Sequence, residues 1–301
     1  MIERHLPVLA EAVAELAAGC RRVVDGTVGS GGHAERLRAT GAEVLAVDRD
    51  PDALARARER LGDEGMSWVA GRFGDPAVLD EIARFRPDFV LLDLGVSSEQ
   101  LDTDGRGFSF RPGVPLDMRM DGQGRTASEL LNRLPESELA ELFREYGDER
   151  RSRRLAATVV RRRQTPFTTS DDLVNAIRAA LGPRTGPATF ARLFQAVRIA
   201  VNDELGELRR ALPVLRDALP PQGRLAVISY HSGEDRIVKH LFREWARACV
   251  CPPAQPVCTC RGRALGILDP AKPIVPTDAE IAANPRARSA RLRAFRTNGA
   301  A

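Results

Sequence analysis

The chain lacks any long apolar run. Within its 301 residues, no stretch approaches the roughly 18 consecutive apolar residues needed to cross a membrane as a helix. Its first residues include Glu3, Arg4, His5 and Glu11 in place of an apolar segment, so we expect no signal peptide. The sequence therefore predicts a cytoplasmic protein with no membrane partner.

Lysine is also nearly absent. Lys239 and Lys272 are the only lysines among 45 basic residues, and 41 acidic residues leave a net charge of only +4. An arginine excess can reflect genomic composition as easily as function, so the grouping of the arginines is more informative than their number. The length suffices for two domains and at least one substantial hydrophobic core.

Two short segments near the N-terminus are the most informative. Residues 23–33 combine an apolar run with a glycine-rich turn, and residues 44–48 form an apolar run that ends on a carboxylate. Only glycine lets the backbone approach a ligand this closely or adopt a positive φ freely, so Gly29, Gly31 and Gly32 predict a ligand-binding turn. In doubly wound folds, a carboxylate at the end of the next strand binds ribose hydroxyls. These features predict a nucleoside-bearing cofactor at the carboxyl ends of a parallel sheet.

The carboxylates around this turn bear on the type of cofactor. Gly29-x-Gly31-x-x-Ala34 and Asp48 nominally satisfy the dinucleotide pattern. However, Asp25 precedes the turn, where it would repel a pyrophosphate and attract an ammonium group, and a later predicted strand ends on Asp93. Three carboxylates around one site favour the cationic S-adenosylmethionine over a dinucleotide with its negatively charged pyrophosphate. A dinucleotide oxidoreductase, and a sheet whose strand-end aspartates only cap helices, remain alternatives.

The first part of the chain alternates predicted strands and helices. Asp50 and Pro51 indicate a helix over 51–61 with Asp50 as its N-cap. The strand pattern returns only at residues 225–230. The predicted strands of the first part are 22–28, 43–48, 67–72 and 88–93.

Between these two parts the strand pattern stops. Residues 102–126 are rich in Gly, Asp, Arg and Pro and have no periodicity, which predicts a long functional loop. Helical patterns follow to about residue 219: one helix opens at Ser137, one covers 168–181 with Ser170 as its cap, and one covers 189–210. The sequence therefore predicts a discontinuous α/β domain, 1–103 and 211–301, and an insert, 104–210, made of a loop plus an all-helical subdomain.

Arginines are concentrated in this insert. Residues 149–163 contain seven arginines and one glutamate, on what we interpret as one helix. Guanidinium groups at this density allow several phosphate contacts, which set affinity but not sequence choice. A second basic stretch over 286–296 predicts a short alternating strand. We favour a nucleic-acid partner over the alternative of a solvated helix face.

The cysteines are unevenly distributed. Cys20 stands alone, whereas Cys249-x-Cys251 and Cys258-x-Cys260 flank a proline-rich segment. Four thiols at this spacing can hold a structural zinc ion, although Cys-x-x-Cys pairs are the commoner pattern. A disulfide-forming pair and free thiols in a loop are the alternatives, and no residue is assigned as a metal ligand from the sequence.

Several longer motifs resemble one known family. From His5 to the C-terminus, the chain is similar to the ribosomal small-subunit methyltransferase H family, also called MraW. The motifs that carry the resemblance are Val28-Gly29-Ser30-Gly31-Gly32-His33, Leu92-Asp93-Leu94-Gly95-Val96-Ser97-Ser98, Arg106-Gly107-Phe108-Ser109-Phe110 and Pro115-Leu116-Asp117-Met118-Arg119-Met120, with further matches over 48–51, 194–205, 228–239 and 284–293.

This resemblance implies both a fold and an activity. The implied fold is a class I (Rossmann-like) S-adenosylmethionine-dependent methyltransferase sheet with an inserted all-helical subdomain for substrate recognition. The implied activity is methyl transfer from S-adenosyl-L-methionine to the N4 amine of a cytidine in the decoding region of 16S rRNA, within the small ribosomal subunit. A methyltransferase of DNA or of a small molecule, and a non-enzymatic ribosome assembly factor, are the rival interpretations.

The resemblance also implies a set of cofactor residues, with two departures nearby. The family usually has a bulky apolar residue where Gly233 stands and a phenylalanine at Tyr230. The implied cofactor-binding residues are Gly31, Gly32, His33, Asp48, Phe73, Asp93 and Gln100.

The catalytic residues are less well defined. Many amine methyltransferases carry an Asn/Asp-Pro-Pro-aromatic turn after the fourth strand, but this chain has Asp93-Leu94-Gly95-Val96 there. The candidates are Asp117, Asn202, Asp203 and His231, and a hydrogen-bonded turn histidine is an equal alternative for the last. We also predict that residues 101–122 form a lid in which Phe108 and Phe110 stack on an extruded base while Arg111 and Arg119 bind phosphates.

Overall fold

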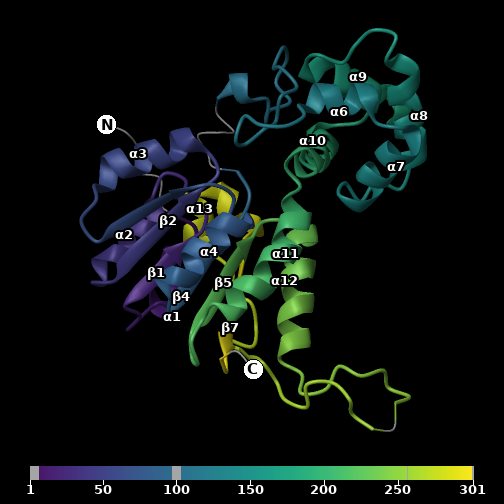
Figure 1. The fold of residues 1–301 in the computed structure, drawn as a ribbon. Helices are drawn as coiled ribbons and strands as arrows, with labels where there is room; N and C mark the ends of the chain where they lie inside the picture. The colour runs from purple at the N-terminus through teal and green to yellow at the C-terminus, as the bar shows by residue number, and fades with distance from the viewer. Residues whose placement is uncertain (1–6, 97–102, 256, 300–301) are drawn as a thin grey trace. The chain divides into compact units, whose positions relative to one another are not determined.

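The computed structural model describes residues 7–96, 103–255 and 257–299. The chain divides into two compact units, Met1–Gly95 with Leu205–Ala301, and Val96–Glu204. The first unit is discontinuous in sequence because the second interrupts it between the fourth and fifth strands (Figure 1). The second unit begins shortly after the fourth strand and ends at the first residue of α11 (Glu204–Asp217), whereas 104–210 was expected from the sequence.

The first unit contains a seven-stranded sheet in the order β3-β2-β1-β4-β5-β7-β6. Strands β1 to β5 pair in parallel, and β7 is antiparallel to both β5 and β6. The strand order reverses between β1 and β4, which is where doubly wound sheets bind ligands. The predicted Rossmann-like class I sheet is confirmed. Its strands are β1 (Arg22–Asp25), β2 (Glu43–Asp48), β3 (Met66–Ala70), β4 (Phe89–Asp93), β5 (Arg224–Ser229), β6 (Gly266–Leu268) and β7 (Arg291–Thr297).

The helices of the first unit cover the sheet on both faces. Val13 and Leu37 share a buried cluster with Ala294 of β7, whereas Phe295, the next residue of β7, packs its ring on Phe242 and Trp245. Among the described residues, no helix is long and apolar enough to cross a membrane. The helices of this unit, besides α11, are α1 (Ala10–Leu16), α2 (Gly32–Ala39), α3 (Pro51–Leu61), α4 (Pro76–Phe85), α12 (Ser232–Trp245) and α13 (Asp278–Ala283), with a 3-10 helix at Pro285–Ser289.

Burial of β7 on both faces corrects the prediction for the second basic stretch. The sequence predicted a strand alternating between buried and exposed residues, but residues 292–295 are all buried. Arg293 is 7% exposed, and its guanidinium contacts the Asp235 carboxylate of α12 at 2.7 and 3.1 Å. A strand covered by helices on both faces has no exposed side, so Arg293 supports the core instead of a partner.

The capping residues predicted from the sequence were correct for one helix and wrong for another. Asp50 caps α3 as predicted, because its side chain accepts a hydrogen bond from the Asp52 amide. The cap of α9 (Ser170–Leu181) is Thr169, which forms a capping box with Asp172, so the assignment to Ser170 was wrong by one residue. Either hydroxyl fits a capping sequence, and only the backbone conformation distinguishes them.

The helix predicted over 189–210 is two helices. The first, α10 (Pro187–Asn202), ends at Asp203, whose φ of 52° is left-handed, and α11 follows at once. A left-handed residue ends a helix and turns the chain. The apolar spacing continues through the junction to Leu205, which is also buried, so hydrophobic periodicity alone did not reveal the break.

The second unit is helical and has its own core. Residues from its helices and from the loop before them, among them Phe143, Phe167 and Leu193, form one buried cluster. The helix predicted to open at Ser137 is α7, and the arginine-rich helix begins only at Ser152. The helices, besides α9 and α10, are α6 (Ala127–Arg133), α7 (Glu136–Glu145) and α8 (Ser152–Arg162), with a 3-10 helix at Asp104–Arg106.

The long loop of the second unit packs into this core. Phe108 is 8% exposed and lies in the buried cluster, together with Met118. The Phe110 ring contacts Phe190 and Phe194 at centroid distances of 6.1 and 6.0 Å. The predicted lid, in which both rings stack on an extruded base, is therefore wrong, because these rings already fill the helical core.

Candidate functional site

The glycine-rich turn between β1 and α2 has the conformation that its sequence requires. Gly29 and Gly31 have φ values of 51° and 83°, in the left-handed region. The Gly31 amide donates to the Val28 carbonyl at 2.7 Å, which closes the turn. A Cβ on Gly31 would lie 2.9 Å from the Leu61 side chain, so a larger residue would have to displace it. The turn brings Gly32 and His33 to the start of α2.

Asp48, at the end of β2, holds this turn in place. Its Oδ2 accepts from the Gly29 amide at 2.7 Å, and its Oδ1 accepts from the Asp50 amide at 2.8 Å. Burial raises the pKa of Asp48, although both amides stabilise its charged form. A carboxylate offers about four acceptor positions, so Asp48 keeps capacity for two further hydroxyl donors.

A polar cluster lies where β1, β4 and β5 end. The Tyr230 hydroxyl donates to Asp93 Oδ1 at 2.9 Å, and His33 Nε2 lies 3.5 Å from Asp93 Oδ2. Burial opposes a charge on His33, but the carboxylates of Asp93 and Asp25 prevail and raise its pKa. Burial, followed by the Asp93 charge, raises the pKa of Tyr230, so its hydroxyl stays a donor. The sequence did not predict that the Tyr230 hydroxyl would bind Asp93.

Asp25 is the buried carboxylate that β1 contributes to this cluster. It is 1% exposed, and within the described structure its Oδ2 has no hydrogen-bond partner. Burial raises the pKa of Asp25 to about 6, since the nearby His33 offsets that burial only in part. A buried acceptor without a donor is costly unless a ligand supplies one. The site therefore fits a cationic group much better than a pyrophosphate.

Phe73 lies beside the glycine-rich turn. It is half-buried, and its Cβ would be 3.6 Å from a Cβ on Gly26. The turn that carries it is tied to α11, because the Gly74 amide donates to Glu207 Oε1 at 3.1 Å. No sequence signal pointed to Glu207, a buried carboxylate on a helix. Gln100, the remaining predicted cofactor residue, lies outside the described residues.

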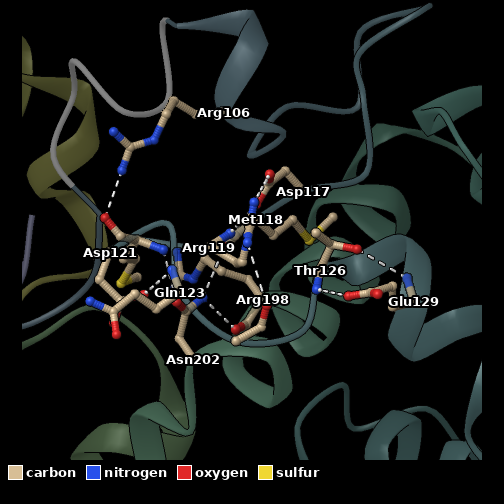
Figure 2. A network of polar contacts seen from close by, with 12 residues as sticks. Arg106, Asp117, Met118, Arg119, Asp121, Gln123, Thr126, Glu129, Arg198 and Asn202 are labelled. Carbon is tan, nitrogen blue, oxygen red and sulfur yellow. Dashed lines mark hydrogen bonds and ion pairs between the residues drawn. The ribbon is translucent and has the colours of Figure 1, made fainter.

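Asn202 organises the loop that carries Asp117 (Figure 2). Its amide nitrogen donates to the Met118 carbonyl at 2.7 Å, and its oxygen accepts from the Met120 amide at 3.0 Å. At 1% exposure, Asn202 is fixed by these bonds and by a third to the Arg198 carbonyl. This geometry makes Asn202 a positioning residue for the loop.

Asp117 and Asp203 lie near this network but differ in setting. Asp117 binds Arg119 through both oxygens, each at 2.8 Å. Partial burial opposes its charge, but the guanidinium dominates and lowers the pKa of Asp117, so it is ionised at neutral pH. Asp203 is exposed and serves as the left-handed C-cap of α10.

His231, the fourth catalytic candidate, belongs to the first unit and caps α12. Its Nδ1 accepts from the Gly233 and Glu234 amides at 3.2 and 3.4 Å, and its Nε2 lies 3.1 Å from Glu234 Oε1. This is the hydrogen-bonded turn histidine that the sequence left open. Since Nδ1 accepts, the neutral ring carries its proton on Nε2. A Cβ at Gly233 would lie 3.1 Å from His231 Nδ1, so a larger residue there would require a small shift of the His231 ring.

Comparison with known proteins agrees with these features. The model of the MraW methylase family matches residues 3–298. The chain belongs to the MraW methylase family. A ribosomal RNA small subunit methyltransferase H from Gemmatimonas aurantiaca is 55% identical over 97% of this chain and 95% of its own length. Proteins of the same name from Heliobacterium modesticaldum and Rubrobacter xylanophilus are 47% and 48% identical, over 98% of this chain and 98% and 96% of their own lengths.

Family membership confirms the resemblance seen in the sequence. The chain is a methyltransferase that uses S-adenosylmethionine. The residues at the strand ends fit that cofactor, because the free Oδ2 of the buried Asp25 carboxylate suits its cationic groups and Asp48 suits a ribose diol.

The arginines of α8 form an exposed basic face in the second unit, which we call the α8 arginine face: Arg153, Arg154, Arg161 and Arg162. Arg163 does not belong to it, because its guanidinium donates to the Leu131 carbonyl at 2.7 Å and to that of Leu134. Nearby, a cavity of about 550 Å³ is lined by residues that include Arg151, Arg184 and Arg192. The face is exposed as a phosphate-binding surface requires.

Proposed function

We propose that this chain transfers a methyl group from S-adenosyl-L-methionine to the N4 amine of a cytidine in the decoding region of 16S rRNA, within the small ribosomal subunit. The observation that carries the proposal is the strand-end site, where the buried Asp25, whose Oδ2 has no hydrogen-bond partner in the described structure, lies beside the glycine-rich turn. Near full-length similarity to proteins named ribosomal RNA small subunit methyltransferase H supports the substrate. The proposed location is the cytoplasm, where that subunit is assembled.

The cofactor contacts follow from the positions of the strand-end residues. We assign the ribose hydroxyls to Asp48, the adenine to Phe73, and the cationic end of the cofactor to the carboxylates of Asp25 and Asp93. Gly31, Gly32 and His33 supply the close backbone approach at the start of α2, and Gln100 is proposed to complete the set. When bound, the cofactor supplies an electrophilic methyl group on a sulfonium.

The target amine sets the demands on the remaining residues. A cytosine amine is a weak nucleophile because its lone pair is delocalised into the ring. The protein must accept hydrogen bonds from the amine protons and hold the nitrogen about 3–3.5 Å from the methyl carbon. Of the four candidates, Asp117 is best suited, because it is ionised and part-exposed, whereas Asn202 and His231 are committed to structural hydrogen bonds.

The α8 arginine face is proposed to bind the RNA backbone. All four arginines are exposed, and the Arg161 guanidinium also donates to Thr158 Oγ1 of the same helix at 3.3 Å. Phosphate contacts of this kind give affinity without choosing a base. The base itself must leave its stack to reach the methyl group, so selection depends on shape around the target nucleotide.

Methyl transfer to defined substrates tests this proposal. Small subunits lacking the modification, free cytidine and duplex DNA are each incubated with tritiated S-adenosylmethionine, and the labelled nucleoside is then identified by mass spectrometry. N4-methylated cytidine from small subunits alone is expected. Equal labelling of duplex DNA or of free cytidine would favour the rival methyltransferase classes. Cofactor binding without transfer to any of them would favour an assembly factor.

A further inference from the structure

Four cysteine side chains gather at one point beyond the C-terminal end of α12. The sulfur atoms of Cys249, Cys251, Cys258 and Cys260 all lie within 4.8 Å of one another. The Sγ of Cys260 is 3.4 Å from that of Cys258 and 3.8 Å from that of Cys249. A disulfide would bring two sulfurs to about 2.05 Å, so these thiols are grouped without being bonded.

We propose that these four cysteines bind one zinc ion as thiolates in a tetrahedral site. A zinc–sulfur bond of about 2.3 Å gives sulfur–sulfur edges of about 3.8 Å in a regular tetrahedron. The two measured separations, 3.4 and 3.8 Å, lie close to that edge length. Four protein ligands leave no open coordination position, so the site is structural.

The segment around the thiols has little else to hold it. Between α12 and β6, none of the described residues from 247 to 265 is buried, and none belongs to a helix or strand. Val257 is 67% exposed. A segment of this length without a hydrophobic core needs another source of stability, and in small domains a metal ion supplies it.

Hydrogen bonds around the thiols match the outer contacts of a metal site. The Val250 amide donates to Cys260 Sγ at 3.3 Å, as amides next to metal thiolates do. The Gln255 side-chain amide donates to the Val257 carbonyl at 3.0 Å and to Thr259 Oγ1 at 2.7 Å, which folds the link between the two cysteine pairs. Both pairs are thereby held toward one point.

The zinc site is separated from the cofactor residues by the length of α12. His231 and Tyr230 lie at its N-terminal end, and the cysteines follow its C-terminal end. A helix of 14 residues spans about 21 Å. Arg261 links the segment to this helix end, since its guanidinium donates to the Glu244 and Arg247 carbonyls. Loss of zinc should therefore loosen residues 246–265 without changing cofactor affinity.

Metal analysis of the full chain tests the proposal. Protein reconstituted with zinc under reducing conditions and then desalted should retain about one ion per chain, and a Cys258→Ser, Cys260→Ser double variant should retain almost none. Cys20→Ser is the matched control and should retain zinc like the parent, because Cys20 lies outside the cluster. Calorimetry with S-adenosylmethionine shows whether each variant is folded.

Cobalt substitution provides a test that needs no variant. Cobalt(II) in a site of four thiolates gives strong sulfur-to-metal charge-transfer absorption and tetrahedral d–d bands, which we expect for the parent chain. A parent that retains no zinc and gives no such bands would overturn the proposal. A double variant that folds and still retains the metal would also overturn it, because the ion would then be bound elsewhere.

Discussion

The Tyr230 hydroxyl donates a hydrogen bond to the Asp93 carboxylate at 2.9 Å, linking the residue after β5 to the end of β4. Asp93 also faces His33, so one carboxylate connects three elements around the cofactor site. Tyr230 thereby orients the carboxylate that we propose binds the cationic end of the cofactor.

Removing this hydroxyl should weaken cofactor binding modestly. Tyr230→Phe deletes one donor to a charged acceptor and leaves the ring in place, so we expect a loss of about 0.5–1.5 kcal/mol in S-adenosylmethionine binding. Calorimetry measures it. Tyr146→Phe, which alters the only other tyrosine and lies in the second unit, is the control. An unchanged dissociation constant for Tyr230→Phe would show that Asp93 is oriented without it.

Asp48 should contribute more than Tyr230 to the free energy of S-adenosylmethionine binding. Asp48→Ala removes the acceptor for the ribose and the bond that holds the Gly29 amide, and should weaken binding by about 1.5–3 kcal/mol. Asp80→Ala, which removes an exposed carboxylate on α4, should have no effect. If circular dichroism shows an intact fold and the affinity equals that of the parent, Asp48 is not part of the site.

The buried Asp25 predicts a pH dependence of stability. Its folded-state pKa of about 6 exceeds the ordinary value of 3.8, so the folded chain holds this proton more tightly than the unfolded chain. The stability of the cofactor-free protein should therefore fall as the pH rises from 3.8 through about 6. The expected loss is on the order of 2–3 kcal/mol.

Asp25→Asn separates this contribution from those of other groups. Without a buried charge, the variant should be more stable than the parent at about pH 7.5, and the difference should shrink to about a third of that value at about pH 4.5. It should also bind S-adenosylmethionine more weakly, because the cationic end loses its carboxylate. Denaturant unfolding at both pH values measures the first effect. A variant that is equally destabilised at both would contradict the assignment.

The α8 arginine face should determine affinity for the subunit. Reversing Arg153, Arg154, Arg161 and Arg162 to Glu should weaken subunit binding sharply and reduce its salt dependence, with cofactor binding unchanged. A matched control reverses four exposed or part-exposed arginines of the first unit, namely Arg36, Arg58, Arg60 and Arg84. If both quadruple variants bind equally well, the α8 arginine face is only a solvated surface.

The sequence was sufficient to predict the sheet and the glycine-rich turn between β1 and α2, because both depend on local signals. Glycines at 29 and 31 have the positive φ values that only glycine adopts freely, and Asp50 caps α3 through its own side chain. Apolar strands that end on carboxylates place those carboxylates at one edge of a parallel sheet. These features need no knowledge of distant contacts.

Tertiary contacts decided the features that were predicted wrongly. Phe108 and Phe110 lie in a loop with no periodic pattern, and only the packing of the helical unit shows that both rings belong to its core. Arg293 resembled a basic surface residue until Asp235, far away in sequence, proved to be its partner. The hydrogen bonds of Asn202 and Glu207 likewise join distant residues, so no local pattern could reveal them.

Methyl transfer to small subunits lacking the modification, followed by nucleoside mass spectrometry, is the most direct test of the proposed activity. We expect one N4-methylated cytidine in the decoding region of 16S rRNA, strongly reduced transfer with Asp117→Asn, and parent-like transfer with Asp80→Ala. A methyl group found on another nucleotide, or no transfer from a protein that binds S-adenosylmethionine normally, would contradict it.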